Sequence, residues 1–379
     1  MDEGIVENKV KVKQVKSKKE FKQFINLPEK IYKDDKNWVP KLDMEIKHLL
    51  GDKNPFFEHA WKKLFLAYHD GKTVGRIAAI IDYNYVDFQE EKTGFFGFFD
   101  CIKDKKIAGD LFKTCEQELF KKGMKKVIGP MNPSSNDECG ILVKGFDSSP
   151  RIMMTYNKKY YIDLLESNGY HKAKDLLAFN MQVQQGPLNR LEKIVDRIKK
   201  KSPDMYSRSA NLKKFDLEVK NVREVYNQAW EKNWGFVPWT ENEIKDLAKQ
   251  LKPLVIPELL QIGFCGEEPI GFSLALPDYN QAVKKVGRKL LPFGWLKFLY
   301  YKNKIKDLRL LAMGVKKQYQ NKGIGPIMYY NSLVEAMKKG YRECEYSWIL
   351  EDNIETIKIG KMMGGEIYKT YRIYEKELS

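Results

Sequence analysis

The chain has 379 residues and a formal net charge of +16; 43% of its residues are hydrophobic and 31% are charged. This length exceeds what one hydrophobic core usually serves, so two domains are expected, and the composition excludes a disordered or fibrous chain. The excess of lysine and arginine suits polyanions such as nucleic acid, anionic membrane or a phosphate-bearing cofactor, although a lysine-rich surface can also serve solubility alone.

Five cysteines are spread along the chain, at Cys101, Cys115, Cys139, Cys265 and Cys344. They form no C-x-x-C pair and their number is odd, which argues against a disulfide framework or a zinc site and favours a reducing compartment. The first four residues are polar, unlike a signal peptide, and no apolar run reaches the roughly 18 residues that a membrane span needs. We therefore expect a soluble, cytoplasmic protein without a metal site.

The first half is predicted to mix strands and helices. An Asp-Gly pair, Asp70-Gly71, separates two apolar runs and is a strong hairpin signal. The period of the apolar residues predicts the other elements. The expected strands cover about 10–15, 65–68, 73–81, 94–102, 126–130 and 176–183, and the expected helices begin near 21, 105 and 160.

A charged stretch follows in which Leu191, Ile194, Val195 and Ile198 recur at helical spacing. This pattern predicts an amphipathic linker helix over 186–204, ended near the proline at 203. We therefore expect an N-terminal domain over 1–185 and a C-terminal domain over 205–379.

The second half repeats the order of the first: hairpin, strand, helix, strand, helix, strand. A repeat on this scale predicts duplication of a domain. The expected elements are helices over 222–234 and 241–251, strands over 259–265, 270–276 and 308–315, a helix over 327–339, a strand over 343–350, a helix over 354–363 and a strand over 366–375. An insertion at 281–306 interrupts the pattern.

A glycine-containing turn joins the expected strand 308–315 to the next helix, with the spacing Gln320-x-x-Gly323-x-Gly325. Free amides at a helix N-terminus, together with the helix dipole, form a site suited to phosphate. Neither G-x-x-x-x-G-K-[ST] nor G-x-G-x-x-G is present, which excludes the two best-known phosphate loops.

This spacing, after a strand that ends in valine, resembles the acetyl-CoA motif of the GNAT (GCN5-related N-acetyltransferase) superfamily. Asn353, Ile357, Met363 and Gly364 resemble the family's next conserved stretch. The whole chain resembles bacterial proteins that carry two such domains in tandem. The resemblance implies an α/β (α+β) fold of two tandem GNAT-like domains, each a mixed, mostly antiparallel sheet flanked by helices.

The resemblance also implies acetyl-CoA or another acyl-CoA as the bound cosubstrate. Main-chain groups of Met313 and Val315 would bind its pantetheine arm, and Asn353 would contact it from the next strand. Lys316, Lys317 and Lys322 would add positive charge near the phosphates. The CoA diphosphate would be held by the turn, which consists of Gln320, Asn321, Lys322, Gly323, Ile324 and Gly325.

The acid and base of such a reaction stay open. The tyrosine that often protonates the departing CoA thiolate in this family aligns with Gly360, and the strand 308–315 has no glutamate at the usual base position. The candidates are Asp278 and Glu345 as bases and Tyr330, Tyr329 or Tyr346 as acids. For each of them a packing role is the alternative, and an amine that arrives neutral needs no base.

The first half lacks the Q/R-x-x-G-x-G spacing between 101 and 111, so it is expected to be a degenerate partner that shapes the substrate site. Its loop 129–140 is dense in short polar side chains. Turns that satisfy their own backbone are the alternative. The candidate substrate residues are Asn132, Asn136, Asp137 and Glu138 in this loop, and Trp234 and Asn280 in the second half, where core packing is the alternative for the tryptophan.

The 281–306 segment holds eight Lys/Arg and no acidic residue around an aromatic body. It can lie on an anionic membrane, cover a long acyl chain, or be an ordinary helical insertion.

The function that agrees best with these features is transfer of an acetyl or longer acyl group from acyl-CoA to the amine of an unidentified acceptor, by direct attack. One alternative is a tandem transferase that uses aminoacyl-tRNA, which the positive charge suits but an intact CoA turn does not. Another is a non-catalytic protein that binds or senses acyl-CoA. Neither the acceptor nor the oligomeric state follows from the sequence.

Overall fold

The computed structural model describes residues 10–379. The polar start of the chain, on which the expectation of no signal peptide depends, lies outside the described residues. Contacts divide the chain into two units, one formed by residues up to Asp175 with Tyr371–Ser379 and the other by Leu176–Thr370. Two long strands, β9 (His171–Gln182) and β15 (Glu366–Glu377), run from one unit into the other.

The first unit is a sheet in the order β1-β2-β3-β4-β5-β15, antiparallel except between β4 and β5. Its strands are β1 (Lys11–Gln14), β2 (Ala60–His69), β3 (Lys72–Asp82), β4 (Thr93–Cys101) and β5 (Lys126–Gly129), with the short β6 (Met131–Asn132), β7 (Glu138–Cys139) and β8 (Ile141–Lys144) after them. Its helices are α1 (Lys18–Ile31), α2 (Asp43–Leu49), η1 (Pro55–Glu58), α3 (Tyr83–Gln89), α4 (Lys105–Lys121) and α5 (Tyr161–Glu166).

Local chemistry explains these elements. The predicted turn joins β2 to β3, and Asp70 and Gly71 both have positive φ, at 49° and 71°, as a two-residue hairpin turn requires. Helix α4 presents the predicted apolar stripe to the sheet, because Ile107, Leu111 and Cys115 are fully buried in the core of this unit.

The second unit is a sheet in the order β9-β14-β13-β12-β11-β10, antiparallel except between β13 and β14. Its further strands are β10 (Met205–Ser209), β11 (Leu260–Cys265), β12 (Glu268–Pro277), β13 (Asp307–Val315) and β14 (Glu343–Leu350). Its helices are α6 (Gln185–Lys201), η2 (Leu212–Lys214), α7 (Phe215–Ala229), α8 (Glu241–Leu251), η3 (Pro257–Leu259), α9 (Asn280–Val286), α10 (Gly294–Lys302), η4 (Lys317–Tyr319), α11 (Ile324–Lys338) and α12 (Ile354–Met362). The predicted mixed, mostly antiparallel sheets flanked by helices are confirmed.

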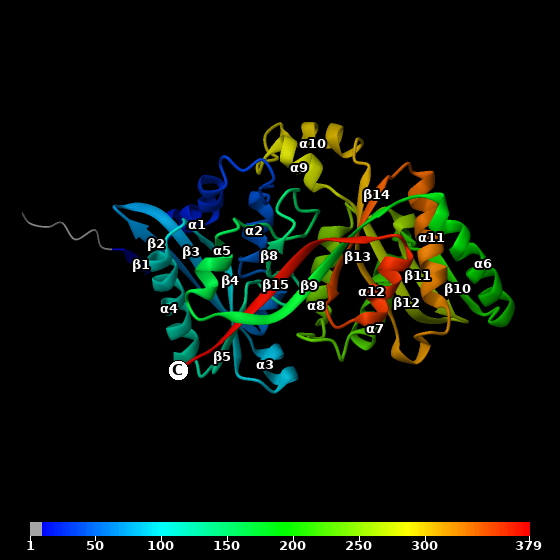
Figure 1. The fold of residues 1–379 in the computed structure, drawn as a ribbon, viewed down its shortest axis with the longest axis horizontal. Coiled ribbons are helices and arrows are strands. Elements are labelled where there is room, and N and C mark those ends of the chain that lie inside the picture. The colour runs from blue at the N-terminus through cyan, green and yellow to red at the C-terminus, as the bar shows by residue number, and fades with distance from the viewer. Residues whose placement is uncertain (1–9) are drawn as a thin grey trace, which may run out of the picture. The chain divides into compact units, whose positions relative to one another are not determined.

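The predicted linker helix has a different role. Helix α6 lies beside α11 (Figure 1), and its Val195 and Ile198 pack with Ile324 and Ile327 in one apolar cluster. Its apolar stripe therefore belongs to the second unit and covers the helix that follows the glycine turn.

The units also divide elsewhere than at the expected boundary of 185–205. The end of β15, at Tyr374–Glu377, pairs with β5 in the first unit, whereas the end of β9 pairs with β14 in the second. Each sheet thus takes its last strand from beyond the expected boundary. Alternation of apolar residues predicts that a segment is a strand, but it does not predict which sheet the strand joins.

Candidate functional site

In the second unit, β13 separates from its parallel neighbour. It pairs with β14 only from Asp307 to Leu310, and Leu310 lies opposite Tyr346 at the last of these pairs. On its other side the register with β12 shifts at Leu311, as in a β-bulge. Among the described residues, 312–315 then pair with β12 alone. The Val315 carbonyl accepts a hydrogen bond of 3.3 Å from the Gln320 side chain. The other β14-facing main-chain groups of this stretch are therefore available to a ligand.

The glycine turn lies directly after this strand. Asn321 and Gly323 have positive φ, at 61° and 111°, and α11 begins at Ile324. No side chain caps α11. Because the first amides of a helix have no partner within the helix, this N-terminus is suited to an anion.

The two glycines of the turn serve different purposes. A Cβ on Gly323 would lie 2.8–2.9 Å from the side chain of Ile198 on α6, so this glycine is required by packing as well as by its φ. A Cβ on Gly325 would have open space apart from the Met313 side chain at 3.8 Å. A side chain would therefore have room at Gly325 but not at Gly323. The contact between Gly325 and Met313 places the turn next to the end of β13 that does not pair with β14.

The three lysines near the turn also differ. The expectation for Lys316 is wrong, because it is 2% exposed and its ammonium bonds to Glu224 at 2.6 Å and Glu268 at 2.9 Å. Lys317 and Lys322 are exposed. The neighbouring Lys232 lowers the pKa of Lys317, as expected where positive charges gather.

Asn353 caps the next helix. Its side-chain oxygen accepts a hydrogen bond of 3.1 Å from the amide of Thr356 at the start of α12. Gly360, which stands where the family's tyrosine aligns, is buried, and a Cβ there would lie 3.2–3.3 Å from the ring of Phe179 on β9. The Phe179 ring takes space that a tyrosine at this position would need.

Glu345 belongs to a buried network. It is fully buried and accepts hydrogen bonds from Ser347 at 2.6 Å and from Tyr368, and Arg309 lies 3.6 Å away. Arg309 is 2% exposed and donates to Ser347 at 3.0 Å. A carboxylate held this way acts first as the partner of a buried cation.

Of the three tyrosines considered as the acid, the structure favours Tyr329 and Tyr346, which are hydrogen-bonded to each other, over Tyr330. The Tyr330 hydroxyl lies 3.4 Å from Glu192 on α6. By contrast, Tyr329 of α11 donates at 2.9 Å to Tyr346, which lies where β13 and β14 part. Burial raises the pKa of Tyr346, although its hydrogen bonds with Tyr329 and Thr356 oppose the rise, so the phenol keeps its proton at neutral pH.

Asp278 and Asn280 lie at the end of β12, beside the start of β13. The amide of Asp278 donates to the carbonyl of Asp307, and the Asp278 side chain is buried. This is the paired end of β13, not the end that leaves β14. Trp234 is half-buried in the loop after α7.

A residue that the sequence reasoning missed is Trp230 of α7. A Cβ on Gly314 of β13 would lie 2.7 Å from the Trp230 ring, which also packs edge-on against Phe272. The sequence did contain one signal for this contact, Gly314, because a glycine inside a strand often marks a place where another group lies close to the backbone.

The polar loop of the first unit is engaged with its own chain. Asn132 accepts a hydrogen bond of 2.6 Å from the amide of Phe98 on β4. Asp137 accepts a bond of 2.7 Å from Ser134, whose hydroxyl also accepts from the amide of Asn136. Glu138 forms an ion pair with Lys41, which raises the pKa of Lys41 even though burial of the ammonium lowers it. The loop is thus at least in part a set of turns, as the alternative interpretation had it.

Among the described residues, no helix is long and apolar enough to cross a membrane.

No model of a protein family matches the sequence. Protein YghO of Escherichia coli (strain K12) is 36% identical over 370 residues, which are 96% of this chain and 94% of that protein. The bacterial ceramide synthase of Caulobacter vibrioides (strain NA1000 / CB15N) is 38% identical over 373 residues, 96% of each chain.

Solved structures agree on the fold at low identity. A tandem GNAT protein from the clavulanic acid biosynthesis pathway, solved without AcCoA, has a TM-score of 0.58 at 10% identity, covering 98% of this chain and 99% of its own. The glucosamine N-acetyltransferase region of a fungal β-N-acetylglucosaminidase has a TM-score of 0.60 at 11% identity, covering 98% of this chain and 38% of that protein. The chain has the fold of two GNAT domains in tandem, and it belongs to the family of YghO and the bacterial ceramide synthase.

Proposed function

We propose that this protein transfers an acyl group from acyl-CoA to an amine, and that the reaction takes place in the second unit where β13 leaves β14. The observation that carries the proposal is the juxtaposition of three features: the unpaired end of β13, the open face of Gly325 and the uncapped N-terminus of α11. Together they offer main-chain donors for a pantetheine amide and an anion site for a diphosphate.

The chemistry follows from this arrangement. The amine of the acceptor attacks the thioester carbonyl, a C–N bond forms, and the C–S bond breaks. Amides of β13 beyond Leu310 would polarise the carbonyl oxygen. Tyr346, which keeps its proton at neutral pH, would protonate the departing CoA thiolate, and the proton lost by the amine passes to solvent.

For the acceptor we propose a long-chain amino alcohol. One of the two relatives bears the name ceramide synthase and matches this chain from end to end. A ceramide is the amide of a fatty acid with such an amine, so a long-chain acyl-CoA would be the donor. Asp278, Asn280 and Trp234 stay proposals for the acceptor side, although Asp278 lies beside Asp307, at the end of β13 that pairs with β14.

The test is calorimetric titration of the full chain with acetyl-CoA and palmitoyl-CoA. The structure selects Gly325→Glu as the blocking variant, because a Glu side chain there would enter the anion site from its open face. We expect binding to weaken by more than about 100-fold, about 2.7 kcal/mol. Gly325→Ala is the matched control and should bind like the natural chain.

No binding of either acyl-CoA by the natural chain would overturn the proposal. Thiol release from palmitoyl-CoA is then measured with sphinganine and with a panel of short amines. Binding without release across the whole panel would favour a non-catalytic acyl-CoA-binding protein, which the absence of the family's tyrosine at Gly360 also suits.

A further inference from the structure

We propose that the 281–306 segment, with its two helices α9 and α10, is a surface that binds the second unit to an anionic membrane. The inference concerns where the protein works and does not depend on the proposed reaction.

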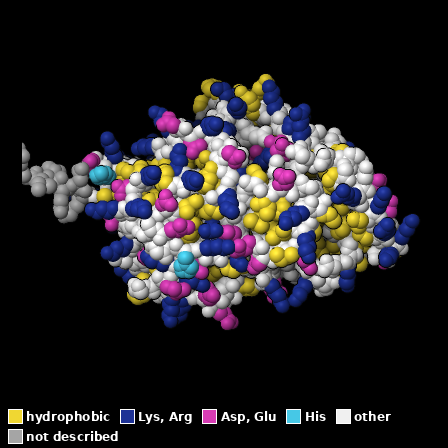
Figure 2. All heavy atoms as spheres, in the orientation of Figure 1, with side chains coloured by type: hydrophobic (Ala, Val, Ile, Leu, Met, Phe, Trp, Pro, Cys, Tyr) yellow, Lys and Arg dark blue, Asp and Glu magenta, His cyan; other side chains and the backbone are white. Residues whose placement is uncertain are grey.

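The first observation is the exposure of large apolar side chains. Leu291 is 79% exposed and Phe293 71%, and the helix that follows continues the surface. Within residues 291–300 the exposed large apolar side chains are Leu291, Phe293, Trp295, Leu296, Leu299 and Tyr300. No other ten-residue stretch of the described chain exposes more than two. At the top of Figure 2, hydrophobic side chains lie together over this segment.

The second observation is that α10 is apolar on two faces. Its inner face is anchored, since Phe298 stacks on Tyr279 with 5.9 Å between ring centroids, and a Cβ on Gly294 would lie 2.4 Å from the carbonyl oxygen of Lys289. Its outer face presents Trp295 and Leu299, one turn apart, to solvent. A helix that is apolar all round is normally covered on every side.

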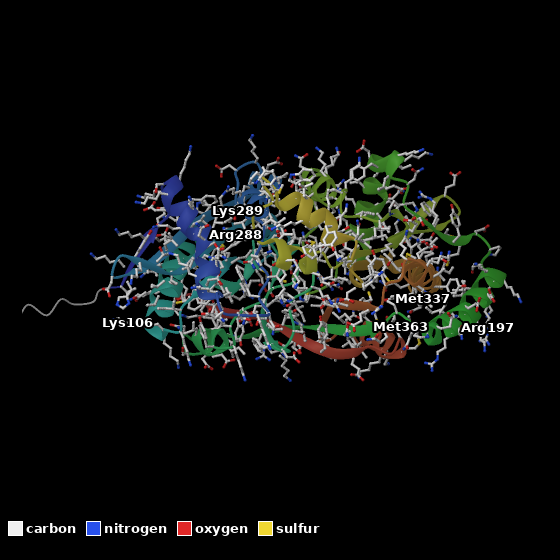
Figure 3. All side chains as sticks on the ribbon, turned by 90° about the horizontal axis from the view of Figure 1, so that it is seen from above. Lys106, Arg197, Arg288, Lys289, Met337 and Met363 are labelled. Carbon is white, nitrogen blue, oxygen red and sulfur yellow. The ribbon has the colours of Figure 1, made fainter. Side chains whose placement is uncertain are left out.

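The third observation is the charge beside this face. The segment has eight Lys/Arg and no acidic residue, and Lys289 and Lys297 are exposed. In Figure 3, which looks down on the segment, Arg288 and Lys289 lie on the chain between α9 and α10. Basic side chains around an apolar face match the anionic headgroups and acyl boundary of a bilayer.

Two other occupants fit less well. A lid over an acyl chain would turn its apolar side chains inward, whereas these side chains face solvent. A symmetric pair of copies joined by this face would bring two sets of eight like charges together. A membrane satisfies both the apolar face and the charge.

The test is flotation of the full chain with vesicles of phosphatidylcholine alone and of phosphatidylcholine with phosphatidylglycerol. We expect binding to the anionic vesicles to be at least about tenfold stronger, as several lysines near the surface predict. Phe293→Ser with Trp295→Ser should weaken that binding by about tenfold or more, whereas Phe120→Ser, at a residue of α4 that is 53% exposed, should not.

Charge reversal gives an independent arm. Lys289→Glu with Lys297→Glu should weaken binding to anionic vesicles by about fivefold or more for each lysine. The control, Lys199→Glu with Lys200→Glu on the exposed face of α6, should have a smaller effect. Brominated lipid should quench the fluorescence of the natural chain more than that of Trp295→Phe.

Three outcomes would overturn the proposal: no binding to anionic vesicles, control variants that lose binding as much as the test variants, or a stable dimer that the Phe293→Ser and Trp295→Ser changes dissociate. Thermal unfolding of every variant, compared with the natural chain, shows whether the fold is intact. Because vesicle binding needs no acyl-CoA, its failure is distinct from failure of the proposed reaction.

Discussion

Both units contain a strand that separates from its parallel neighbour and leads into a helix. Only in the second unit does the region between that strand and helix stay open. In the second unit β13 parts from β14 after Leu310, and α11 begins without a side-chain cap. In the first unit β4 likewise pairs with β5 only as far as Phe95. There, however, Asn132 bonds to the amide of Phe98, and the carboxylate of Asp104 accepts the first amides of α4 at 2.9 and 3.0 Å.

The difference suggests a way in which a duplicated fold keeps its architecture while one copy closes the region that the other leaves open. The same polar main-chain groups must be satisfied in both units. In the first unit the chain's own side chains satisfy them, and the oxygen of Met131 lies where a Cβ on Gly97 would be, only 1.8 Å away. In the second unit residues 312–315 of β13 have no partner on β14, so we propose ligand binding in that unit.

The largest expected effect concerns a feature that both units share, a buried ion pair on the sheet. Asp100 accepts from Arg76 at 2.7 and 2.8 Å and from the hydroxyls of Tyr32 and Tyr161. Asp100→Ala leaves Arg76 buried without its partner and should lower the free energy of unfolding by about 3–5 kcal/mol. Urea denaturation measures the loss. Glu345→Ala tests the equivalent pair in the second unit, and a loss below about 1 kcal/mol in both would contradict this role.

The next effect is on catalysis and tests whether Tyr346, at the point where β13 and β14 separate, acts as the general acid. Tyr346 stands at the last parallel pair of the second unit, where the first unit has Ile128. Tyr346→Phe should lower kcat by up to about 100-fold, the lower end of what a general acid contributes, while acyl-CoA affinity stays the same. Its raised pKa predicts that activity persists as pH rises past neutral and falls only where the phenol ionises. Tyr330→Phe is the matched control, and an equal loss in both variants would remove Tyr346 from this role.

A smaller effect separates the two glycines of the turn. Gly323→Ala forces a side chain into Ile198 at a φ of 111°, and should cost about 1–3 kcal/mol of stability. Gly325→Ala has space and should be close to neutral. Thermal unfolding of the two variants side by side checks this; equal losses would mean that the space at Gly325 is not open.

Removing the side-chain cap of α4 in the first unit should lower its stability by about 1 kcal/mol. Asp104→Ala removes the acceptor for the amides of Lys106 and Ile107 and should destabilise the first unit by about that amount. It should not create a second acyl-CoA site, because Asn132 still occupies the strand beside it. A titration with two binding sites in this variant would show that the cap alone had closed the first unit.

The smallest effect concerns the ion pair between Asp175 of β9 and Arg372 of β15, which lies in the parts of these two strands that belong to the first unit. Burial alone raises the pKa of Asp175, but two hydrogen bonds from Arg372, at 2.7 and 3.0 Å, lower it overall. A carboxyl with a lowered folded-state pKa stabilises the fold above its unfolded pKa of about 3.9 and loses this contribution as pH falls through the folded value. The pair is partly exposed, so we expect less than about 1 kcal/mol. Asp175→Asn should flatten the unfolding free energy between pH 5 and about 2; an unchanged slope would contradict the assignment.

Much of the fold could be predicted from the sequence, because periodicity and turns are local. The hairpin at Asp70-Gly71, the apolar face of α4 and the turn before α11 are where the sequence indicates them. The sequence predicted helix α6 but not its packing partner, because an amphipathic stripe does not say what covers it; Ile198 packs on the glycine turn.

The candidate site was predicted less completely. The spacing of Gln320, Gly323 and Gly325 predicted a turn at a helix N-terminus, and α11 begins there, but only the packing of α6 shows that a side chain has room at Gly325 and none at Gly323. The Tyr329–Tyr346 hydrogen bond joins residues 17 positions apart on two elements, and no local pattern contains it.

The sequence by itself determined that both halves combine strands and helices, that a glycine-containing turn follows one strand of the second half, and that 281–306 is basic and apolar. These properties follow from local spacing and composition. Only the tertiary structure decided that Asn132 bonds to the amide of Phe98 in the first unit, and that the last strand of the chain completes the first sheet. Such contacts join distant residues, and which groups meet is settled by packing, not by the order of residues along either segment.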